Sequence, residues 1–135
     1  MRASVVLLFG LAACSSGSGS ATFGSTPFSS VTSAACDARF DAYSAPDPLT
    51  RGDGEVEIVA TSSETNAPLD GLSISMIAWM PAMGHGSSTT PVVTAQGNGK
   101  YVASGLVLAM PGDWQLRTDI GGACTDSIVF NVSVE

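Results

Sequence analysis

The sequence predicts an all-β fold, an immunoglobulin-like β-sandwich of about seven strands. Short segments in which apolar and polar residues alternate recur at a spacing of about ten residues. Glycine, proline and asparagine lie between these segments and mark turns. No stretch combines helical periodicity with capping residues. A small β-barrel would produce the same pattern and is the alternative architecture.

The start of the chain has the pattern of a signal peptide. Arg2 gives a positively charged start, and residues 5–11 form an apolar segment too short to span a bilayer. The four residues from Leu11 to Cys14 resemble the lipobox of bacterial lipoproteins, in which the cysteine is acylated. An ordinary secretory signal with an incidental Cys14 is the alternative. We expect a signal peptide over residues 1–13 and lipidation of Cys14. This anchor would attach the chain to a membrane of the bacterial cell envelope, facing the periplasm or the extracellular side.

Acidic side chains dominate the charge of the chain. The full sequence has a formal net charge of −7 at pH 7, and removal of residues 1–13 takes away only Arg2, which leaves −8. Such a surface repels nucleic acid, so we expect no nucleic-acid partner. Hydrophobic residues make up 44% of the sequence and charged residues only 13%, which favours a packed domain over an acidic disordered chain.

A segment without charged residues follows the lipobox. Between Ser15 and Ala35 the sequence contains eight Ser, three Gly and three Thr. This composition is typical of a flexible linker. We therefore expect a tether over residues 14–35 and a folded domain over residues 36–135.

The domain is expected to consist of strands joined by turns. The Asn98-Gly99 pair is typical of a two-residue hairpin turn between two of them. Met76 and Trp114 fall at inward positions of their strands, so we assign both to the core. The alternation of apolar and polar residues places strands at residues 36–43, 55–60, 72–78, 91–96, 100–108, 114–120 and 128–134.

Cys36 and Cys124 remain as a pair if Cys14 is lipidated. Outside the cytoplasm, two such cysteines form a disulfide more often than they remain thiols. A bridge between positions so far apart in the sequence stabilises the fold by about 4 kcal/mol, through the entropy of the unfolded chain. A two-cysteine metal site is the alternative, which the spacing does not favour because it differs from C-x-x-C.

The stretch from Trp79 to Gly86 concentrates residues with binding chemistry. It contains Met80, Met83 and His85, the only histidine of the chain. Pro81 should end the preceding strand because proline donates no ladder hydrogen bond, so we expect the stretch to form a loop. Thioether sulfur and imidazole nitrogen suit Cu(I) and offer no oxygen ligand to Mg²⁺ or Ca²⁺. The alternative is that the methionines fill the core and the histidine lies on the surface.

A second Met-Pro pair occurs beside a tryptophan, in the segment from Met110 to Trp114. If both segments lie at the same end of the sandwich, Met110 can join Met80, Met83 and His85 around one ion. Three sulfurs and one nitrogen would be suitable ligands for Cu(I). Either tryptophan could then cover the site and exclude water.

These segments resemble the YtkA-like domain family, which is related to the FixH group. The resemblance rests on residues 66–71, 79–86, 99–101 and 106–114, and it extends over roughly residues 55–120. It implies an extracytoplasmic β-sandwich that is often lipid-anchored or joined to copper-handling and oxidase-assembly modules. It also implies metal binding without catalysis, a role that here would belong to Met80, Met83, His85 and Met110.

The residues outside this cluster argue against an enzyme. The chain has one histidine, no nucleophile beside a base, and carboxylates that are scattered singly. We therefore expect a copper-binding protein that handles or delivers Cu(I). The alternative is a structural or interaction module of the cell envelope, in which exposed methionines dock a partner protein.

Overall fold

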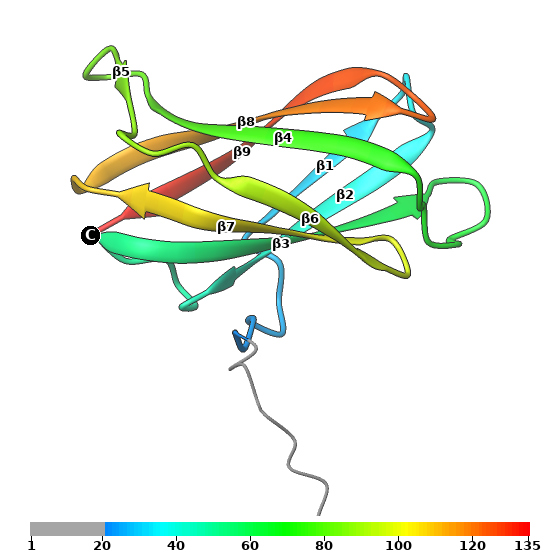
Figure 1. The fold of residues 1–135 in the computed structure, drawn as a ribbon, viewed down its shortest axis with the longest axis horizontal. Coiled ribbons are helices and arrows are strands. Elements are labelled where there is room, and N and C mark those ends of the chain that lie inside the picture. Colours follow the sequence, from blue (N-terminus) through cyan, green and yellow to red (C-terminus); the bar gives the residue numbers. More distant parts are fainter. Residues whose placement is uncertain (1–20) are drawn as a thin grey trace, which may run out of the picture.

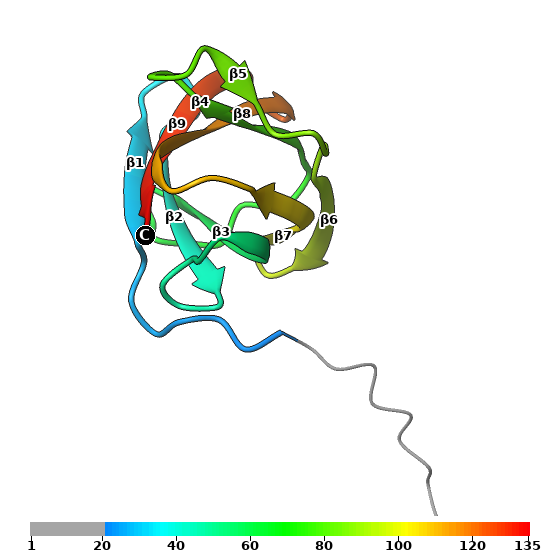
Figure 2. The ribbon, with the colours of Figure 1, turned by 90° about the vertical axis from the view of Figure 1, so that its left-hand side faces the viewer.

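Two antiparallel sheets packed face to face form the fold (Figures 1 and 2). The computed structural model describes residues 21–135, so the expected signal peptide and the expected lipidation of Cys14 lie outside the described residues. In the described part of the chain, no helix is long and apolar enough to cross a membrane. The strands within residues 21–135 are β1 Ser29–Ser33, β2 Ala38–Ala45, β3 Gly52–Ser62, β4 Leu72–Met80, β5 His85–Gly86, β6 Val92–Gly97, β7 Lys100–Leu108, β8 Gly112–Gly122 and β9 Asp126–Val134.

The strands divide into one sheet of five and one sheet of four. Sheet A has the order β1-β2-β3-β7-β6, and sheet B has the order β5-β4-β8-β9. β1 packs beside β9 at one edge, and Figure 2 shows the two layers closing around the core. The predicted all-β sandwich is confirmed, with nine strands among the described residues in place of about seven.

The core lies between the inward faces of the two sheets. Inward and outward side chains alternate along the strands, as in β4, where Met76 and Ala78 are buried and Ile77 is exposed. Met76 and Trp114 are only 1% and 2% exposed, which confirms their assignment to the core. The largest fully buried side chains are Trp114, Tyr101, Phe40, Phe130, Ile58 and Met76.

β1 lies inside the segment that we expected to be a tether, residues 14–35. It pairs with β2 over its whole length, from Ser29 opposite Ala42 to Ser33 opposite Ala38. Val31 packs against the core, and Ser33 is buried. The folded domain therefore begins before Cys36.

The two ends of the sandwich differ in how they are closed. At one end, the Cys36–Cys124 disulfide joins the β1–β2 turn of sheet A to the β8–β9 turn of sheet B, so the predicted bridge is present. The β3–β4 loop and the β6–β7 turn lie at this end as well (Figure 1), which we call the disulfide end. The opposite end carries the β4–β5 turn and the β7–β8 turn, and we call it the methionine end.

Hydrogen bonds tie the loops of the disulfide end to one another. Asn98 and Gly99 have positive φ angles of 54° and 71°, which confirms the predicted two-residue turn. The Gly99 amide donates to Asp70 Oδ1 over 2.8 Å. The Tyr101 hydroxyl donates to the Leu69 carbonyl over 2.8 Å and accepts from the Leu72 amide over 3.2 Å. This end is therefore fixed by partners on several strands.

Candidate metal site

The β4–β5 turn positions most of the predicted ligands. Met80 is the last residue of β4, and its carbonyl accepts hydrogen bonds from Met83 N over 3.2 Å and from Gly84 N over 3.0 Å. Gly84 has a φ of +64°, a conformation that glycine adopts without strain. The chain then returns through β5, which begins at His85. The stretch is therefore a tight hairpin.

Our expectation that Trp79 and Met80 belong to a loop is wrong. Both residues pair within sheet B, Trp79 with Gln115 and Met80 with His85. Proline lacks a backbone N–H only at its own position, so Pro81 ends the strand after Met80 and leaves the preceding pairs intact. The Met80 side chain consequently points into the sandwich and is only 3% exposed.

Met80 and His85 are directly opposite each other on neighbouring strands. Directly opposed residues of an antiparallel pair project to the same face of the sheet, with their Cβ atoms about 5 Å apart. Because Met80 faces the core, the His85 side chain lies on the same inner face, where it is half-buried. The hairpin thus brings a thioether and an imidazole together.

The His85 ring has one nitrogen engaged by the backbone. Its Nδ1 lies 3.2 Å from the Gly86 carbonyl oxygen. A carbonyl oxygen only accepts, so in the neutral ring the proton of this contact is on Nδ1. The lone pair of the neutral ring is then on Nε2, the arrangement found in many metal-binding histidines.

The second Met-Pro segment packs against Met80. Gly112, two residues after Met110, has a φ of +126°, and a Cβ atom placed on it would lie 2.7 Å from the Met80 methyl carbon. The thioether therefore rests on the glycine backbone. Met110 is partly buried against the core, and its carbonyl accepts a hydrogen bond from Trp114 Nε1 over 3.0 Å. Sequence reasoning missed Gly112, although a glycine beside a Met-Pro pair was the available signal.

Met83 differs from the other predicted ligands because it lies at the surface. It is in the turn between β4 and β5, and its side chain is 54% exposed. The structure thus brings together Met80, His85 and the turn that contains Met110, and it leaves Met83 at the outside of the same end. Convergence of all four side chains on one ion stays a prediction.

The two tryptophans have different positions relative to this cluster. Trp114 is buried between the sheets next to the Met110 carbonyl. Trp79 projects from the outer face of sheet B, where the Arg117 guanidinium carbon lies 5.0 Å from its ring centroid. Of the two, Trp114 is therefore the one that can shield a site on the inner face.

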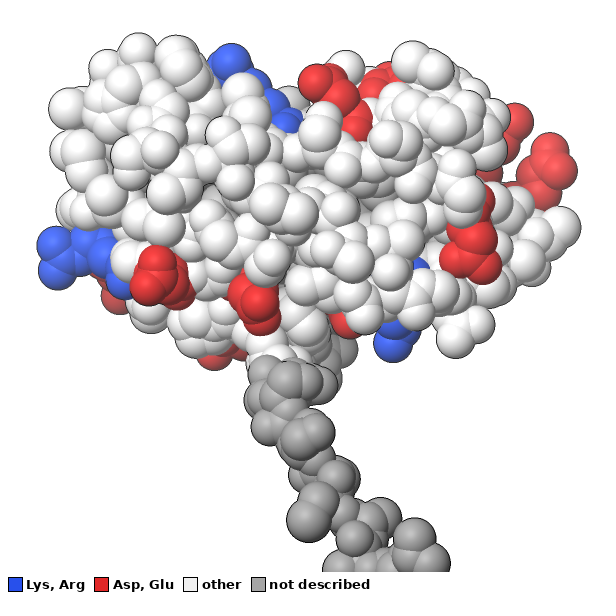
Figure 3. Space-filling view, viewed as in Figure 1, with Lys and Arg blue, Asp and Glu red and all other residues white. Residues whose placement is uncertain are grey.

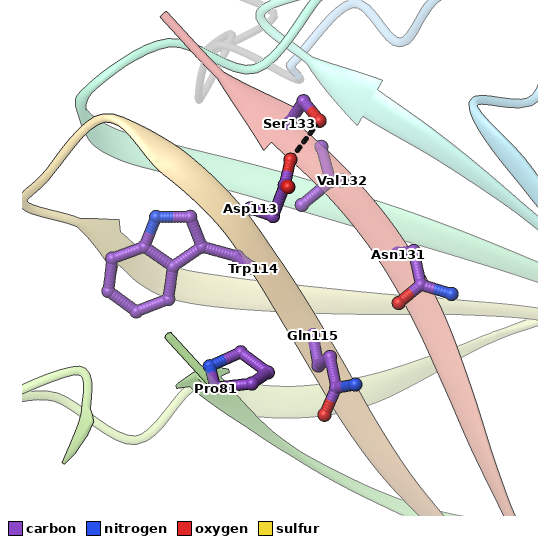
Figure 4. Close-up of a pocket in the computed structure, with 7 residues that line it drawn as sticks. All are labelled: Pro81, Asp113, Trp114, Gln115, Asn131, Val132 and Ser133. Atoms are coloured by element: carbon purple, nitrogen blue, oxygen red, sulfur yellow. Dashed lines mark hydrogen bonds between the residues drawn. The ribbon is translucent and has the colours of Figure 1, made fainter. Parts of the chain in front are cut away.

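The outer face of sheet B has a shallow pocket of about 330 Å³ at the methionine end. Figure 4 shows that Trp114 points away from Gln115 and Asp113, and that Asp113 accepts a hydrogen bond from the Ser133 hydroxyl. The polar groups here are carboxylate, amide and hydroxyl oxygens and amide nitrogens, without a sulfur ligand. The pocket is therefore chemically different from the cluster on the inner face. Its lining residues are Pro81, Asp113, Trp114, Gln115, Asn131, Val132 and Ser133.

Charged side chains do not form a ligand set. Within residues 21–135, no three residues of the types His, Cys, Asp and Glu gather closely enough to hold a metal ion. In Figure 3 the corner of the molecule that β5 occupies in Figure 1 is free of acidic side chains. The donors of the cluster on the inner face are thus neutral sulfur and nitrogen atoms.

Comparison with known proteins identifies the domain. Residues 32–119, well over half of the chain, match the model of the YtkA-like family. The chain belongs to the YtkA-like family. This YtkA-like domain is similar in fold to a copper-bound variant of FetP from uropathogenic Escherichia coli, with a TM-score of 0.56 and 11% sequence identity. The similarity covers 80% of this chain and 95% of the FetP chain. No curated protein matches the sequence.

Proposed function

We propose that this YtkA-like domain binds Cu(I) at its methionine end and handles or delivers the ion in the bacterial cell envelope. The proposal depends mainly on the cross-strand pair of Met80 and His85, whose side chains share the inner face of sheet B. The contact of the Met80 methyl group with Gly112 adds the turn that contains Met110. These two observations support a site in which the Met80 thioether, the His85 imidazole and the Met110 thioether bind one ion.

The chemistry of these donors favours a soft monovalent ion. Thioether sulfur binds Cu(I) well, whereas Mg²⁺ and Ca²⁺ require oxygen ligands. The donors are neutral, so a bound Cu(I) adds only one charge to the site. The net charge of −7 of the chain attracts cations to the molecule. The copper-bound state of FetP, which has a similar fold, supports the same choice of metal.

Delivery of the ion would use the exposed ligand. Met83 lies at the surface, and Met80 lies inside. Met83 is therefore placed to contact an arriving ion first and to complete the set with Met80, His85 and Met110 through a change of rotamer. A closed set of four ligands leaves no position for a substrate, which fits a binding protein and does not fit an enzyme. A lipid anchor at Cys14 would hold the domain at the envelope membrane.

An anaerobic titration with Cu(I) against a competing chelator tests the proposal. The purified chain should bind one equivalent tightly, and simultaneous replacement of Met80, Met83 and His85 by Leu, Leu and Phe should abolish this binding. Met76→Leu is the matched control, because Met76 is also a buried, inward-facing methionine of β4. It lies four residues before Met80 and away from the β4–β5 turn. Equal affinity of the triple variant and the control would reject the proposal.

A docking function is the second candidate, and the exposure of Met83 favours it. An exposed methionine in a turn can adapt to a partner surface. In that case Cu(I) binding would be weak and insensitive to the triple replacement. A crosslinkable amino acid at position 83 would then capture an envelope protein, and the same probe at the exposed Val92 would not.

A further inference from the structure

We propose that Met83 is a redox-sensitive ligand whose oxidation to the sulfoxide releases the metal from the methionine end. The release of the metal rests on the proposed function, whereas the selective oxidation of Met83 does not depend on that function. We assign the oxidation to Met83 because its side chain is far more exposed to solvent than those of the neighbouring methionines. Met83 is 54% exposed, and the other two methionines of β4 and its turn, Met76 and Met80, are 1% and 3% exposed.

Oxidation transfers one oxygen atom to the sulfur. The thioether lone pair attacks one oxygen of hydrogen peroxide, the O–O bond breaks and an S–O bond forms. The proton of the transferred oxygen passes to the leaving hydroxide, which departs as water. The sulfur loses the two electrons that the peroxide gains. The reaction requires contact between sulfur and oxidant, so an exposed sulfur reacts before a buried one. Met110, which is partly buried, should react after Met83 and before Met80.

The product has the wrong donor character for Cu(I). A sulfoxide presents a hard oxygen where the thioether presented a soft sulfur, and a soft ion binds oxygen poorly. The fold should tolerate the change, because the new polar oxygen remains in water. The turn itself is held by the backbone bonds from Met83 N and Gly84 N to the Met80 carbonyl, which do not use the Met83 side chain. Oxidation therefore removes one ligand and preserves the scaffold.

Graded peroxide treatment of the purified chain, followed by peptide mass spectrometry, tests the modification site. Sulfoxide should accumulate at Met83 first, with Met76 and Met80 unmodified until the protein unfolds. Preloading with Ag(I), a soft monovalent ion that peroxide does not oxidise, should slow oxidation of Met83, because coordination uses one sulfur lone pair and makes the sulfur a weaker nucleophile. Oxidation of Met80 or Met76 before Met83 would overturn the inference.

A Cu(I) titration after the peroxide treatment tests the switch. The Cu(I) affinity should fall by at least about tenfold. Loss of a residue that only holds a metal ligand in place already costs about this much, and loss of a ligand itself should cost at least as much. Met76→Leu should show the same fall. Met83→Leu should begin with a weaker affinity and should not fall further after the treatment.

The outcomes separate this inference from the proposed function. Tight binding that survives complete sulfoxide formation at Met83 overturns the switch and leaves the copper site standing. Absence of tight binding before any treatment overturns the copper site and the switch together. In that case the measured order of oxidation still reports whether Met83 is the reactive sulfur.

Discussion

The disulfide end and the methionine end of the sandwich are closed by different chemistry. At the disulfide end, a covalent bond and hydrogen bonds from Tyr101 and Asp70 fix turns of both sheets. At the methionine end, the β4–β5 turn is closed by backbone bonds to the Met80 carbonyl, and its inner face carries a thioether and an imidazole side by side. The methionine end has hydrogen bonds of its own, such as that from Trp114 Nε1 to the Met110 carbonyl, but among the described residues its thioether sulfurs have no hydrogen-bond partner and remain available to a ligand.

This difference indicates a division between stability and binding. Side chains that already have partners hold the loops in one conformation. Donor atoms without strong partners lower stability slightly and can bind a ligand. Near the methionine-end terminus of β2, the Ser44 hydroxyl is buried without a hydrogen-bond partner, the only such side-chain atom among the described residues. If the division is correct, changes at one end should affect stability alone, and changes at the other should affect metal binding.

Removal of the disulfide should have the largest effect on stability. Replacement of Cys36 and Cys124 by Ala should lower the free energy of unfolding by about 4 kcal/mol, because the closed loop restricts the unfolded chain. Urea denaturation of the variant and of the oxidised parent measures the difference. Cu(I) affinity, measured under conditions in which the variant is folded, should stay the same. A variant that is folded in the binding assay but has lost tight Cu(I) binding would show that the two ends are coupled.

Truncation of Met80 should affect both properties. Met80→Ala leaves a cavity at a position that is 3% exposed, so it should cost about 2–5 kcal/mol of stability. Met80→Leu keeps the volume and should cost less than about 1.5 kcal/mol, yet it removes the sulfur. Thermal or chemical denaturation of the pair separates packing from ligand chemistry. A large stability loss in the Leu variant would mean that the thioether has a structural role.

Loss of the Tyr101 hydroxyl should have a smaller effect that is confined to the disulfide end. Tyr101→Phe leaves the Leu69 carbonyl and the Leu72 amide without this partner, which should cost about 1–3 kcal/mol. Urea denaturation measures the cost, and hydrogen exchange should show faster opening of the β3–β4 loop. Met83→Leu, an exposed position, serves as the control and should stay within about 0.5 kcal/mol of the parent.

Asp126 should contribute the smallest effect, and the contribution should depend on pH. The hydroxyl of Ser33 and then the backbone amide of Ser127 hold the pKa of the Asp126 carboxyl below its ordinary value. A depressed pKa in the folded state stabilises the fold above the unfolded pKa, and this stability is lost as the pH falls through the folded pKa. Parent and Asp126→Asn should therefore differ in melting temperature near neutral pH and converge as the pH falls through the folded-state pKa of Asp126. A constant difference across the acid range would contradict this.

Most of the fold was predictable because the strands are regular. Alternation of apolar and polar residues identified seven of the strands, and the Asn98-Gly99 pair identified a turn whose positive φ angles the structure contains. β1 was missed because its Ser and Thr residues gave it the composition of a linker, although Val31 is an inward residue of this strand. β5 was missed because two residues show no periodicity.

The site was less predictable because its arrangement depends on register. The residue types identified Met80 and His85, but the sequence did not show that Met80 ends a strand and faces inward. The position of Met110 relative to Met80 depends on how β4 and β8 pair, and on the space that Gly112 leaves for the thioether. Exposure of Met83 follows from the turn conformation, which composition alone does not specify.

The Cu(I) affinity of Met80→Leu tests the central claim most directly. This variant removes one sulfur from the inner face, keeps the packing volume, and can be compared with Met76→Leu from the same strand. In a competition titration, Met80→Leu should bind Cu(I) at least about tenfold more weakly than the parent, and Met76→Leu should match the parent. Equal affinities for all three proteins would contradict a metal site at the methionine end.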